Sequence, residues 1–240
     1  MKDRQIKIFI DFDGTISTED VGEKIFIETI SDGKVQPILE DIKNKAISAR
    51  EGWARLFEAS EGLTLEKISR IAGTIQLEKG IDEFLGYCAE QQFDIYILSD
   101  GFEEYITMIL GRYGITGIPL YANRLAPAAD GSLSPVFPWT DEECPVCANC
   151  KRNHLISNSS DNDVTVYIGN GSSDTCPVGY ADYVFAKDYL LKYCEKERIT
   201  FFPYKDFFDV RKRFIELADG RKMKKRHRAE TLRKQLYKLG

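Results

Sequence analysis

Three short apolar runs of the sequence each end in side chains that can handle phosphate. The run QIKIFI is followed by Asp11 and Asp13, FDIYIL by Ser99, Asp100 and Gly101, and VTVYIG by Asn170 and Asp174, while Lys151 lies shortly before the third run. Two aspartates only two positions apart repel each other and are costly to desolvate, so we expect a cation between them. Carboxylates, a hydroxyl, a lysine and a glycine-rich turn form a set suited to a phosphoryl group and Mg²⁺, a cation that prefers hard oxygen ligands.

The apolar runs have the composition of buried parallel strands, which are short and rich in apolar residues. The expected strands are Gln5 to Ile10, Phe93 to Ser99, Val164 to Asn170 and Tyr183 to Lys187. Helical periodicity separates them, which predicts an α/β fold with a Rossmann-like open parallel sheet. Functional groups collect beyond the carboxyl ends of the strands in such sheets, and the polar residues above stand at those ends.

The helical block between the first two strands is too long for a simple crossover connection. It predicts an inserted small helical cap over residues 17–79, in a core formed by residues 1–16 and 80–220, with Thr64 as the N-cap of the last cap helix. Within the core, the extended pattern of residues 118–137 around an Ala-Asp-Gly turn predicts a β-hairpin, or flap. Residues 221–240 form a basic C-terminal tail.

Charge is distributed unevenly along the 240 residues, whose net charge is −5. The tail holds nine Lys and Arg against one acidic residue, which leaves 24 basic and 37 acidic side chains, a balance of −13, in the rest of the chain. An acidic body lacks the phosphate-neutralising surface that nucleic-acid binding needs, so we expect a solvated, partly helical tail and no nucleic-acid partner. No segment has the length of a membrane span and the first residues lack a signal-peptide layout, so we expect a cytoplasmic protein.

Three of the six cysteines, Cys144, Cys147 and Cys150, stand at metal-ligand spacing immediately before Lys151. Structural zinc takes four ligands, and His154 or Cys176 would have to complete the set. The alternative is a group of reduced thiols in a loop, because a chain without an export signal has little use for disulfides. Both interpretations stay open, with a structural Zn²⁺ site as the one that the structure can test.

The strand-end motifs DFDGT, LSDG, CK and GNGSSD, in this order, resemble the four motifs of the haloacid dehalogenase (HAD) phosphatase superfamily. The helical insertion is similar to the cap of its phosphoserine-phosphatase-like branch. ISAREGWARLF, PWTDEECPVCANCK and YADYVFAKDYL resemble the methionine-salvage phosphatases that act on 2-hydroxy-3-keto-5-methylthiopentenyl-1-phosphate, a diketo-methylthiopentane phosphate. LSD and DTCPVGY also resemble the phosphoethanolamine/phosphocholine phosphatases. The resemblance covers nearly the whole chain up to the tail.

The resemblance implies a Mg²⁺-dependent hydrolysis of a small phosphorylated metabolite. Asp11 would attack phosphorus and form an aspartyl-phosphate, and Asp13 would act as the acid and base. Ser99 and Lys151 would hold the phosphoryl oxygens. The implied metal ligands are Asp11, Asp13, Asn170 and Asp174, and the implied substrate contacts are Asp20, Arg50, Ser99, Asp100, Gly101 and Lys151.

One position departs from the family pattern, because Asn170 stands where an aspartate ligand is usual. An amide still offers an oxygen but no negative charge, so we expect weaker Mg²⁺ binding by about 1–3 kcal/mol unless Asp174 compensates. Three alternatives follow. The chain could be a catalytically weakened metabolite- or metal-binding protein, a phosphotransferase or mutase, or a phosphatase for phosphoethanolamine, phosphocholine or phosphoserine. The structural alternative for Asp11 and Asp13 is a strand-end turn with a helix cap.

Overall fold

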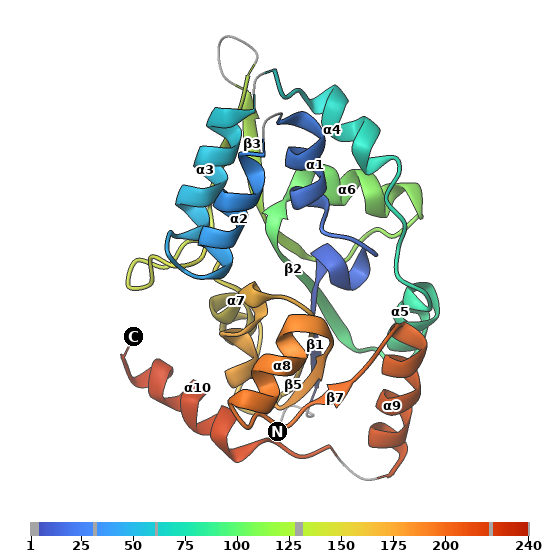
Figure 1. The fold of residues 1–240 in the computed structure, drawn as a ribbon. Helices are drawn as coiled ribbons and strands as arrows, with labels where there is room; N and C mark the ends of the chain where they lie inside the picture. Colours follow the sequence, from blue (N-terminus) through green and yellow to red (C-terminus); the bar gives the residue numbers. More distant parts are fainter. Residues whose placement is uncertain (1–4, 31–32, 61, 128–131, 221–222, 240) are drawn as a thin grey trace. The chain divides into compact units, whose positions relative to one another are not determined.

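The computed structural model describes residues 5–30, 33–60, 62–127, 132–220 and 223–239 (Figure 1). The chain divides into two compact units. The first comprises Met1–Ile16, Leu77–Leu98 and Lys151–Gly240, and the second comprises Ser17–Gln76 and Ser99–Cys150. One boundary between the two units falls after residue 16. Residues 99–150, which we assigned to the core, group instead with the cap helices.

The first unit is built on parallel strands around β1 (Ile6–Asp11). This strand pairs with β2 (Asp94–Phe102) on one side and β5 (Val164–Gly169) on the other. Beyond β5 lie β6 (Tyr183–Ala186) and β7 (Phe202–Pro203), again in parallel. All six residues of β5 are buried, as expected of a strand covered on both faces. The four predicted strands are confirmed, and only the two-residue β7 was not predicted.

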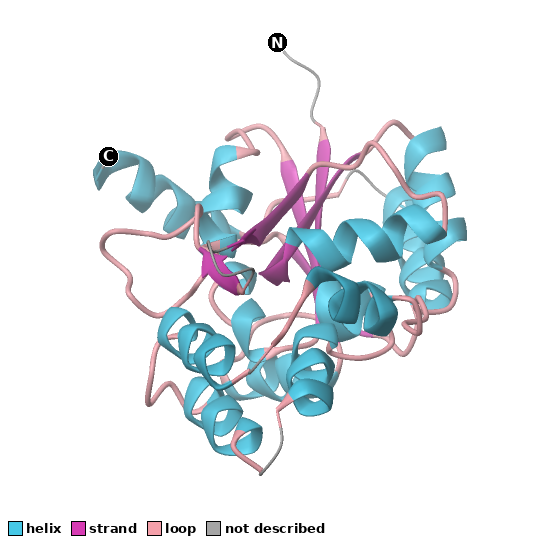
Figure 2. Cartoon of the chain, turned by 90° about the horizontal axis from the view of Figure 1, so that it is seen from above, coloured by secondary structure: helices cyan, strands magenta, loops and turns pink. Residues whose placement is uncertain are grey.

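Helices cover both faces of these strands (Figure 2). Side chains alternate across a strand, so paired Ile168 and Phe185 lie on the face opposite to Thr165. The Phe185 ring contacts Phe214 of α9 (Phe207–Gly220), which packs beside α5 (Ile81–Glu90). Thr165 is contacted on the other face by α10 (His227–Leu239). The remaining elements of the unit are η1 (Phe12–Ile16), α7 (Lys151–Ser157), η2 (Ser172–Asp174), η3 (Pro177–Gly179) and α8 (Asp188–Lys196).

The second unit holds the helices of the predicted cap and a β-hairpin. Its elements are α1 (Val21–Thr29), α2 (Val35–Lys43), α3 (Ala49–Ala59), α4 (Leu65–Ala72), α6 (Glu103–Arg112), β3 (Leu120–Pro127) and β4 (Leu133–Val136). Thr64 caps α4 as predicted, because its hydroxyl accepts the Lys67 N–H at 3.3 Å. The antiparallel pairing of β3 and β4 confirms the predicted hairpin, whose Ala-Asp-Gly turn lies outside the described residues. The sheet order is β4-β3-β2-β1-β5-β6-β7.

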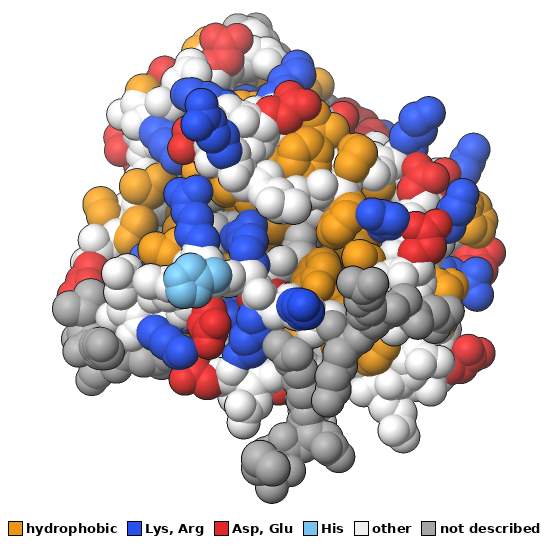
Figure 3. All heavy atoms as spheres, turned by 90° about the horizontal axis from the view of Figure 1, so that it is seen from below, with side chains coloured by type: hydrophobic (Ala, Val, Ile, Leu, Met, Phe, Trp, Pro, Cys, Tyr) orange, Lys and Arg blue, Asp and Glu red, His pale blue; other side chains and the backbone are white. Residues whose placement is uncertain are grey.

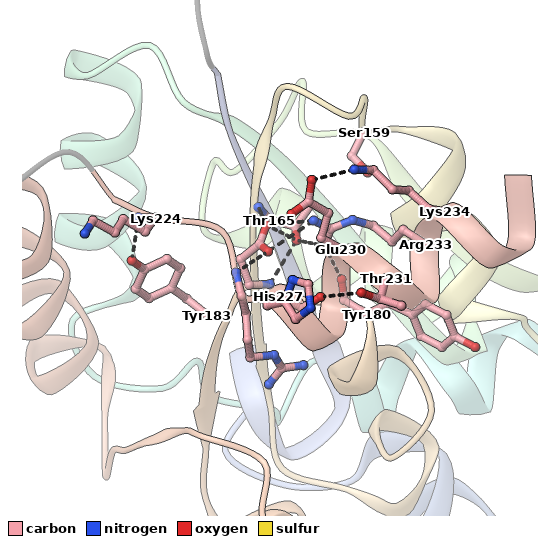
Figure 4. Close-up of polar contacts among 12 residues, drawn as sticks. Ser159, Thr165, Tyr180, Tyr183, Lys224, His227, Glu230, Thr231, Arg233 and Lys234 are labelled. Atoms are coloured by element: carbon pink, nitrogen blue, oxygen red, sulfur yellow. Dashed lines mark hydrogen bonds and ion pairs between the residues drawn. The ribbon is translucent and has the colours of Figure 1, made fainter.

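The basic tail is partly helical as predicted, because residues 227–239 form α10, but this helix is docked on the protein and is not solvated on all sides. Ala229 is fully buried and Arg233 is only 2% exposed. The Arg233 guanidinium donates to both carboxylate oxygens of Asp182 at 3.1 Å and to the Thr165 hydroxyl at 3.0 Å (Figure 4). The charge pattern alone favoured an exposed tail. Arg233 is buried because the buried carboxylate of Asp182 is its ion-pair partner.

The expected absence of a nucleic-acid partner stays a prediction. On the face seen in Figure 3, Lys and Arg side chains lie among Asp, Glu and hydrophobic side chains instead of forming one continuous basic surface of described residues. Within the described ranges, no helix is both long enough and apolar enough to cross a membrane.

Candidate active site

Lys151 lies between two buried carboxylates of the first unit. Its Nζ is 2.5 Å from Asp11 Oδ1 and 2.8 Å from Asp174 Oδ1, and it also donates to Ser173 Oγ at 3.0 Å. The three donors of the ammonium group are thereby used, and Lys151 is 2% exposed. Burial alone would lower the pKa of Lys151, but the charges of Asp11 and Asp174 outweigh it and raise the pKa. The structure therefore brings three of the predicted site residues together as one charged cluster.

Asp174 organises the turn that follows β5. Its Oδ1 accepts from Lys151 and from the Tyr167 hydroxyl, at 2.7 Å for the latter, and its Oδ2 accepts the N–H groups of Asn170 and Gly171 at 3.0 and 2.9 Å. Both oxygens thus already accept two hydrogen bonds. Direct metal ligation by Asp174 stays a prediction, and in this structure its carboxylate accepts from protein donors and holds Lys151 and the turn in place.

Two glycines are required by this close packing. A Cβ at Gly169 would lie 2.5 Å from Asp174 Oδ2, and a Cβ at Gly14 would lie 2.4 Å from Asn170 Nδ2. Gly14 also has a φ of +71°, which other residues rarely adopt. The DFDGT and GNGSSD segments therefore approach each other as closely as backbone and side chain can. The Asn170 amide lies there with its Oδ1 accepting the Thr15 hydroxyl at 3.2 Å.

The cluster has a surplus of negative charge. Burial, together with the charge of Asp174, raises the pKa of Asp11 to about 8 in spite of the attraction of Lys151. Two carboxylates share one ammonium group, and Asp13 stands two positions from Asp11 on a half-buried turn. A bound cation would lower this pKa, because an opposite charge favours the ionised carboxylate.

The oxygen atoms around Asp11 suit Mg²⁺ as a mixed set of ligands and not as a group of carboxylates. Among the described residues, no group of three or more His, Cys, Asp or Glu side chains is arranged to hold a metal. A metal ion at this place would therefore draw on the Asp11 carboxylate together with oxygens of other kinds, namely the Asn170 amide and the main-chain carbonyl of Asp13. Mg²⁺ suits such a set, since it binds through one or two carboxylates and keeps several waters.

The polar end of β2 is held by two asparagines that the sequence analysis missed. The main-chain N–H of Asn149 donates to Asp100 Oδ1 at 2.8 Å, and its amide donates to the carbonyls of Ser99 and Tyr121 at 2.7 and 2.9 Å. Asn123 donates to the carbonyl of Asp100 at 2.7 Å. Both asparagines are buried. The only available signal was the position of Asn149, two residues before Lys151.

Ser99 itself is fully buried, and its Oγ accepts the Gly101 N–H at 2.8 Å. We predicted Gly101 and Asp100 as substrate contacts. In the structure the Gly101 N–H and the Asp100 carboxylate are already hydrogen-bonded within the second unit. Strand pairing relates this segment to the nucleophile candidate, because Asp11 is the register partner of Leu98, the residue before Ser99. The two strand ends are thus neighbours in the sheet.

The two predicted cap contacts differ from each other. Asp20 is exposed and caps α1, since its Oδ1 accepts the Glu23 N–H at 2.8 Å. Arg50 is half-buried on α3, and its side chain forms neither a hydrogen bond nor an ion pair with any residue in the described part of the chain. Arg50 is therefore available to a ligand, while Asp20 has a structural task.

The cysteines do not form the zinc site that we considered. Cys144, Cys147 and Cys150 belong to no group of three or more His, Cys, Asp or Glu side chains of the described residues that could hold a metal. Cys150 is buried with its Sγ 4.0 Å from Asp141 Oδ2, Cys144 and Cys147 are half-buried, and none of the three is in a disulfide. Ligand spacing in the sequence is thus not matched by convergence of the side chains, and the interpretation as reduced thiols remains.

Comparison with known proteins shows the family. The model of the family described as "Putative Phosphatase" matches residues 6–201, most of the chain. The chain belongs to this phosphatase family. As a member, it is a HAD-type phosphoric monoester hydrolase, which confirms the predicted superfamily and enzyme class.

Its relatives include 2-hydroxy-3-keto-5-methylthiopentenyl-1-phosphate phosphatases. The protein of that description from Bacillus mycoides (strain KBAB4) is 30% identical over 210 residues, covering 85% of this chain and 94% of the relative. The one from Bacillus cereus (strain ATCC 14579) is 30% identical over 212 residues with the same coverage. The substrate named for these proteins belongs to them, and the match covers nearly their whole length.

Solved structures show that the family member has the HAD fold. A phosphoserine phosphatase determined as a phospho-aspartyl intermediate analogue has a TM-score of 0.68 at 18% identity, covering 88% of this chain and 99% of the other. A substrate-bound phosphoserine phosphatase complex has a TM-score of 0.68 at 19% identity, covering 89% and 99%. Cytosolic 5'-nucleotidase IIIB bound to cytidine follows with a TM-score of 0.59 at 14% identity, covering 98% and 87%. These likenesses establish the fold alone.

Proposed function

We propose that this phosphatase hydrolyses a small phosphorylated metabolite through a covalent aspartyl-phosphate on Asp11. The observation that carries the proposal is the buried Lys151 ammonium between Asp11 and Asp174. A carboxylate fixed by a lysine at the end of a central strand is a nucleophile whose direction of attack is set before the substrate arrives.

In the first step, an Asp11 oxygen forms a bond to phosphorus, and the bond from phosphorus to the leaving oxygen breaks. Asp13 gives its proton to that oxygen, so that a neutral alcohol departs. In the second step, Asp13 takes a proton from water, the water oxygen attacks phosphorus, and the bond to Asp11 breaks. Lys151 and Ser99 hold the non-bridging oxygens during both steps.

Mg²⁺ is the cofactor that we propose, held by Asp11, the main-chain carbonyl of Asp13 and Asn170. When bound, it supplies positive charge that keeps Asp11 ionised and offsets the charge of the phosphoryl group. Asp174 serves this site by orienting Lys151 and the Asn170–Gly171 turn, which is a different task from the direct ligation that we first expected.

The substrate that we favour is the methionine-salvage diketo phosphate, because two relatives at 30% identity carry that description. Phosphoethanolamine, phosphocholine and phosphoserine are the alternatives to be tested beside it. Asn170 supports a second candidate, a metabolite-binding protein with little turnover, since the amide brings no charge to the metal.

The test is phosphate release from a panel of these esters, with and without Mg²⁺, by the wild type, Asp11→Asn and Asn170→Asp. We expect Mg²⁺-dependent release by the wild type, none by Asp11→Asn, and the best substrate to be the diketo phosphate. Release that persists in Asp11→Asn would contradict the mechanism. Binding of panel members without release by any variant would favour the binding protein.

A further inference from the structure

Tyr167 is a buried tyrosine of β5 whose hydroxyl reaches the charged cluster of the first unit. The side chain has no exposed surface, and its hydroxyl donates to Asp174 Oδ1 at 2.7 Å. A phenol is protonated at neutral pH, and a buried tyrosine hydroxyl usually has a hydrogen-bond partner. The hydroxyl is therefore a neutral donor to the same carboxylate oxygen that contacts Lys151.

The position of the Tyr167 ring depends on Gly169. The two residues are two positions apart in β5, so they lie on the same face of the strand. A Cβ on Gly169 would lie 3.0 Å from the Cε1 atom of the Tyr167 ring and 2.5 Å from Asp174 Oδ2. The ring and the carboxylate thus occupy the space that a side chain would otherwise fill. This close packing limits where the hydroxyl can lie.

The two oxygens of Asp174 are held in different ways. Oδ2 accepts the main-chain N–H groups of Asn170 and Gly171 at 3.0 and 2.9 Å. Oδ1 accepts from Lys151 Nζ at 2.8 Å and from the Tyr167 hydroxyl at 2.7 Å. Among the described residues, Tyr167 is therefore the one donor besides Lys151 that fixes Oδ1.

Lys151 needs a fixed partner because its own hydrogen bonds must change during the reaction. In the free protein its ammonium group donates to Asp11, Asp174 and Ser173. In the proposed mechanism an oxygen of Asp11 bonds to phosphorus, and Lys151 donates to a phosphoryl oxygen. Asp174 and Ser173 are then its protein partners, and the position of Asp174 Oδ1 helps to decide where the remaining donor points.

We propose that Tyr167 is a positioning residue of this phosphatase, which fixes the Asp174 oxygen from which Lys151 is directed at the phosphoryl group. The inference rests on the proposed function, and Tyr167 itself touches neither the substrate nor the reacting atoms. A tyrosine with a structural role alone would stabilise the fold and leave the activity of each folded molecule unchanged. The two roles therefore differ in what the loss of the hydroxyl changes.

The turnover test compares Tyr167→Phe, which removes only the hydroxyl, with Tyr183→Phe, the same change in β6. The Tyr183 hydroxyl accepts the Lys224 N–H at 3.0 Å, outside the charged cluster (Figure 4). The measured quantity is kcat/KM per folded molecule for the best ester of the panel. Both variants should fold, since Tyr167→Phe leaves Asp174 with three of its four donors.

We expect Tyr167→Phe to lower kcat/KM about tenfold, the worth of a hydrogen bond to a charged group. The physical reason is that Asp174 Oδ1 then has Lys151 as its sole donor and draws the ammonium group away from the phosphoryl oxygen. Tyr183→Phe should keep the wild-type value. A wild-type kcat/KM in folded Tyr167→Phe would overturn the inference.

A second measurement does not depend on turnover. In protein with ¹⁵N-labelled lysine, the ammonium ¹⁵N–¹H signal of Lys151 is assigned by its loss in Lys151→Arg and followed as inorganic phosphate is added with Mg²⁺. We expect the signal to move in the wild type and in Tyr183→Phe, because one donor passes from Asp11 to the phosphate. In Tyr167→Phe the movement at saturation should be much smaller.

Equal movement of the Lys151 signal in all three proteins would contradict the role of Tyr167 whether or not the wild type turns over. A different result separates the two proposals. If no ester is hydrolysed while the signal moves in the wild type and moves less in Tyr167→Phe, the proposed hydrolysis fails and the positioning role stands. The two failures are therefore distinguishable.

Discussion

Two buried cations of the first unit, Lys151 and Arg233, each contact carboxylates inside the protein, yet their surroundings differ. Arg233 pairs with the single carboxylate of Asp182 and donates to both of its oxygens at 3.1 Å. Asp182 also accepts the N–H groups of Thr165 and Arg226 at 3.0 and 2.9 Å (Figure 4). This cluster is neutral as a pair and densely hydrogen-bonded.

Lys151 instead serves two carboxylates, Asp11 and Asp174, with one charge. Burial, together with the remaining negative charge, raises the pKa of Asp11, and this charge favours the binding of a cation. The neutral cluster fastens α10 to the sheet, whereas the unbalanced one is prepared for a ligand. Burial of an ion pair therefore says little about its task until its charges and hydrogen bonds are counted.

The largest effect should come from Asp11→Asn, which removes the surplus charge and the proposed nucleophile together. We expect phosphate release to fall more than about 10³-fold. The free energy of unfolding should change by less than about 1 kcal/mol, because Lys151 keeps Asp174 as its partner. Steady-state assays and urea unfolding measure the two quantities, with exposed Asp161→Asn as the control. An Asp11→Asn variant that is strongly destabilised but keeps its specific activity would contradict this prediction, because Asp11 would then have a structural role like that of Asp182.

Arg233→Met should have the opposite profile. It leaves the Asp182 carboxylate buried without its cation, which we expect to lower the free energy of unfolding by about 3–5 kcal/mol. Adding Asp182→Asn should restore part of that loss. Activity per folded molecule should stay near the wild-type value. Urea unfolding of the single and double variants tests this, and a loss below about 1 kcal/mol would show that α10 is held by other contacts.

A titratable group on the helix of Lys151 sharpens the comparison further. His154 is buried, and burial lowers its pKa from 6.5 to about 4. Between these values the unfolded chain binds more protons than the folded protein, so stability is lost as the pH falls from 6.5 towards 4. Over this pH range the lowered pKa of His154 decreases the free energy of unfolding by about 3 kcal/mol. Unfolding curves at pH 7 and 4.5 should show a smaller pH dependence for His154→Gln, and an equal dependence in both proteins would contradict the assignment.

Asn170→Asp adds one charge to the unbalanced cluster and should have the smallest effect. We expect the Mg²⁺ concentration for half-maximal activity to fall by an amount equal to about 1–3 kcal/mol of binding. Titration of activity with Mg²⁺ after chelator treatment gives this value. Exposed Asn162→Asp serves as the matched control, and equal half-saturation in both variants would mean that Asn170 is not a ligand.

The parts of the molecule that sequence patterns predicted are those set by local chemistry. The apolar runs that become β1 and β5 must be covered on both faces, and parallel strands bring their carboxyl ends to one edge. Asp11, Lys151 and Asp174 could therefore be assigned to one cluster from the sequence alone. Thr64 and the hairpin followed from equally local cap and turn preferences.

The missed features depend on partners distant in sequence. The burial of Arg233 requires Asp182, and the task of Asn149 is visible only when Ser99 and Tyr121 are seen beside it. Asp174 could not be known to hold four hydrogen bonds from its position in GNGSSD. The cysteine spacing suggested a zinc site for the same reason, because spacing in the sequence does not determine whether three side chains converge.

The central claim is the covalent use of Asp11, and acyl-phosphate trapping tests it most directly. Wild-type protein is mixed with Mg²⁺ and the best ester of the panel, quenched during turnover and reduced with borohydride, which converts an aspartyl-phosphate to homoserine. Peptide mass spectrometry then locates the change. We predict homoserine at position 11 and nowhere else. Steady phosphate release with unmodified Asp11, or with the label on another residue, would contradict the account.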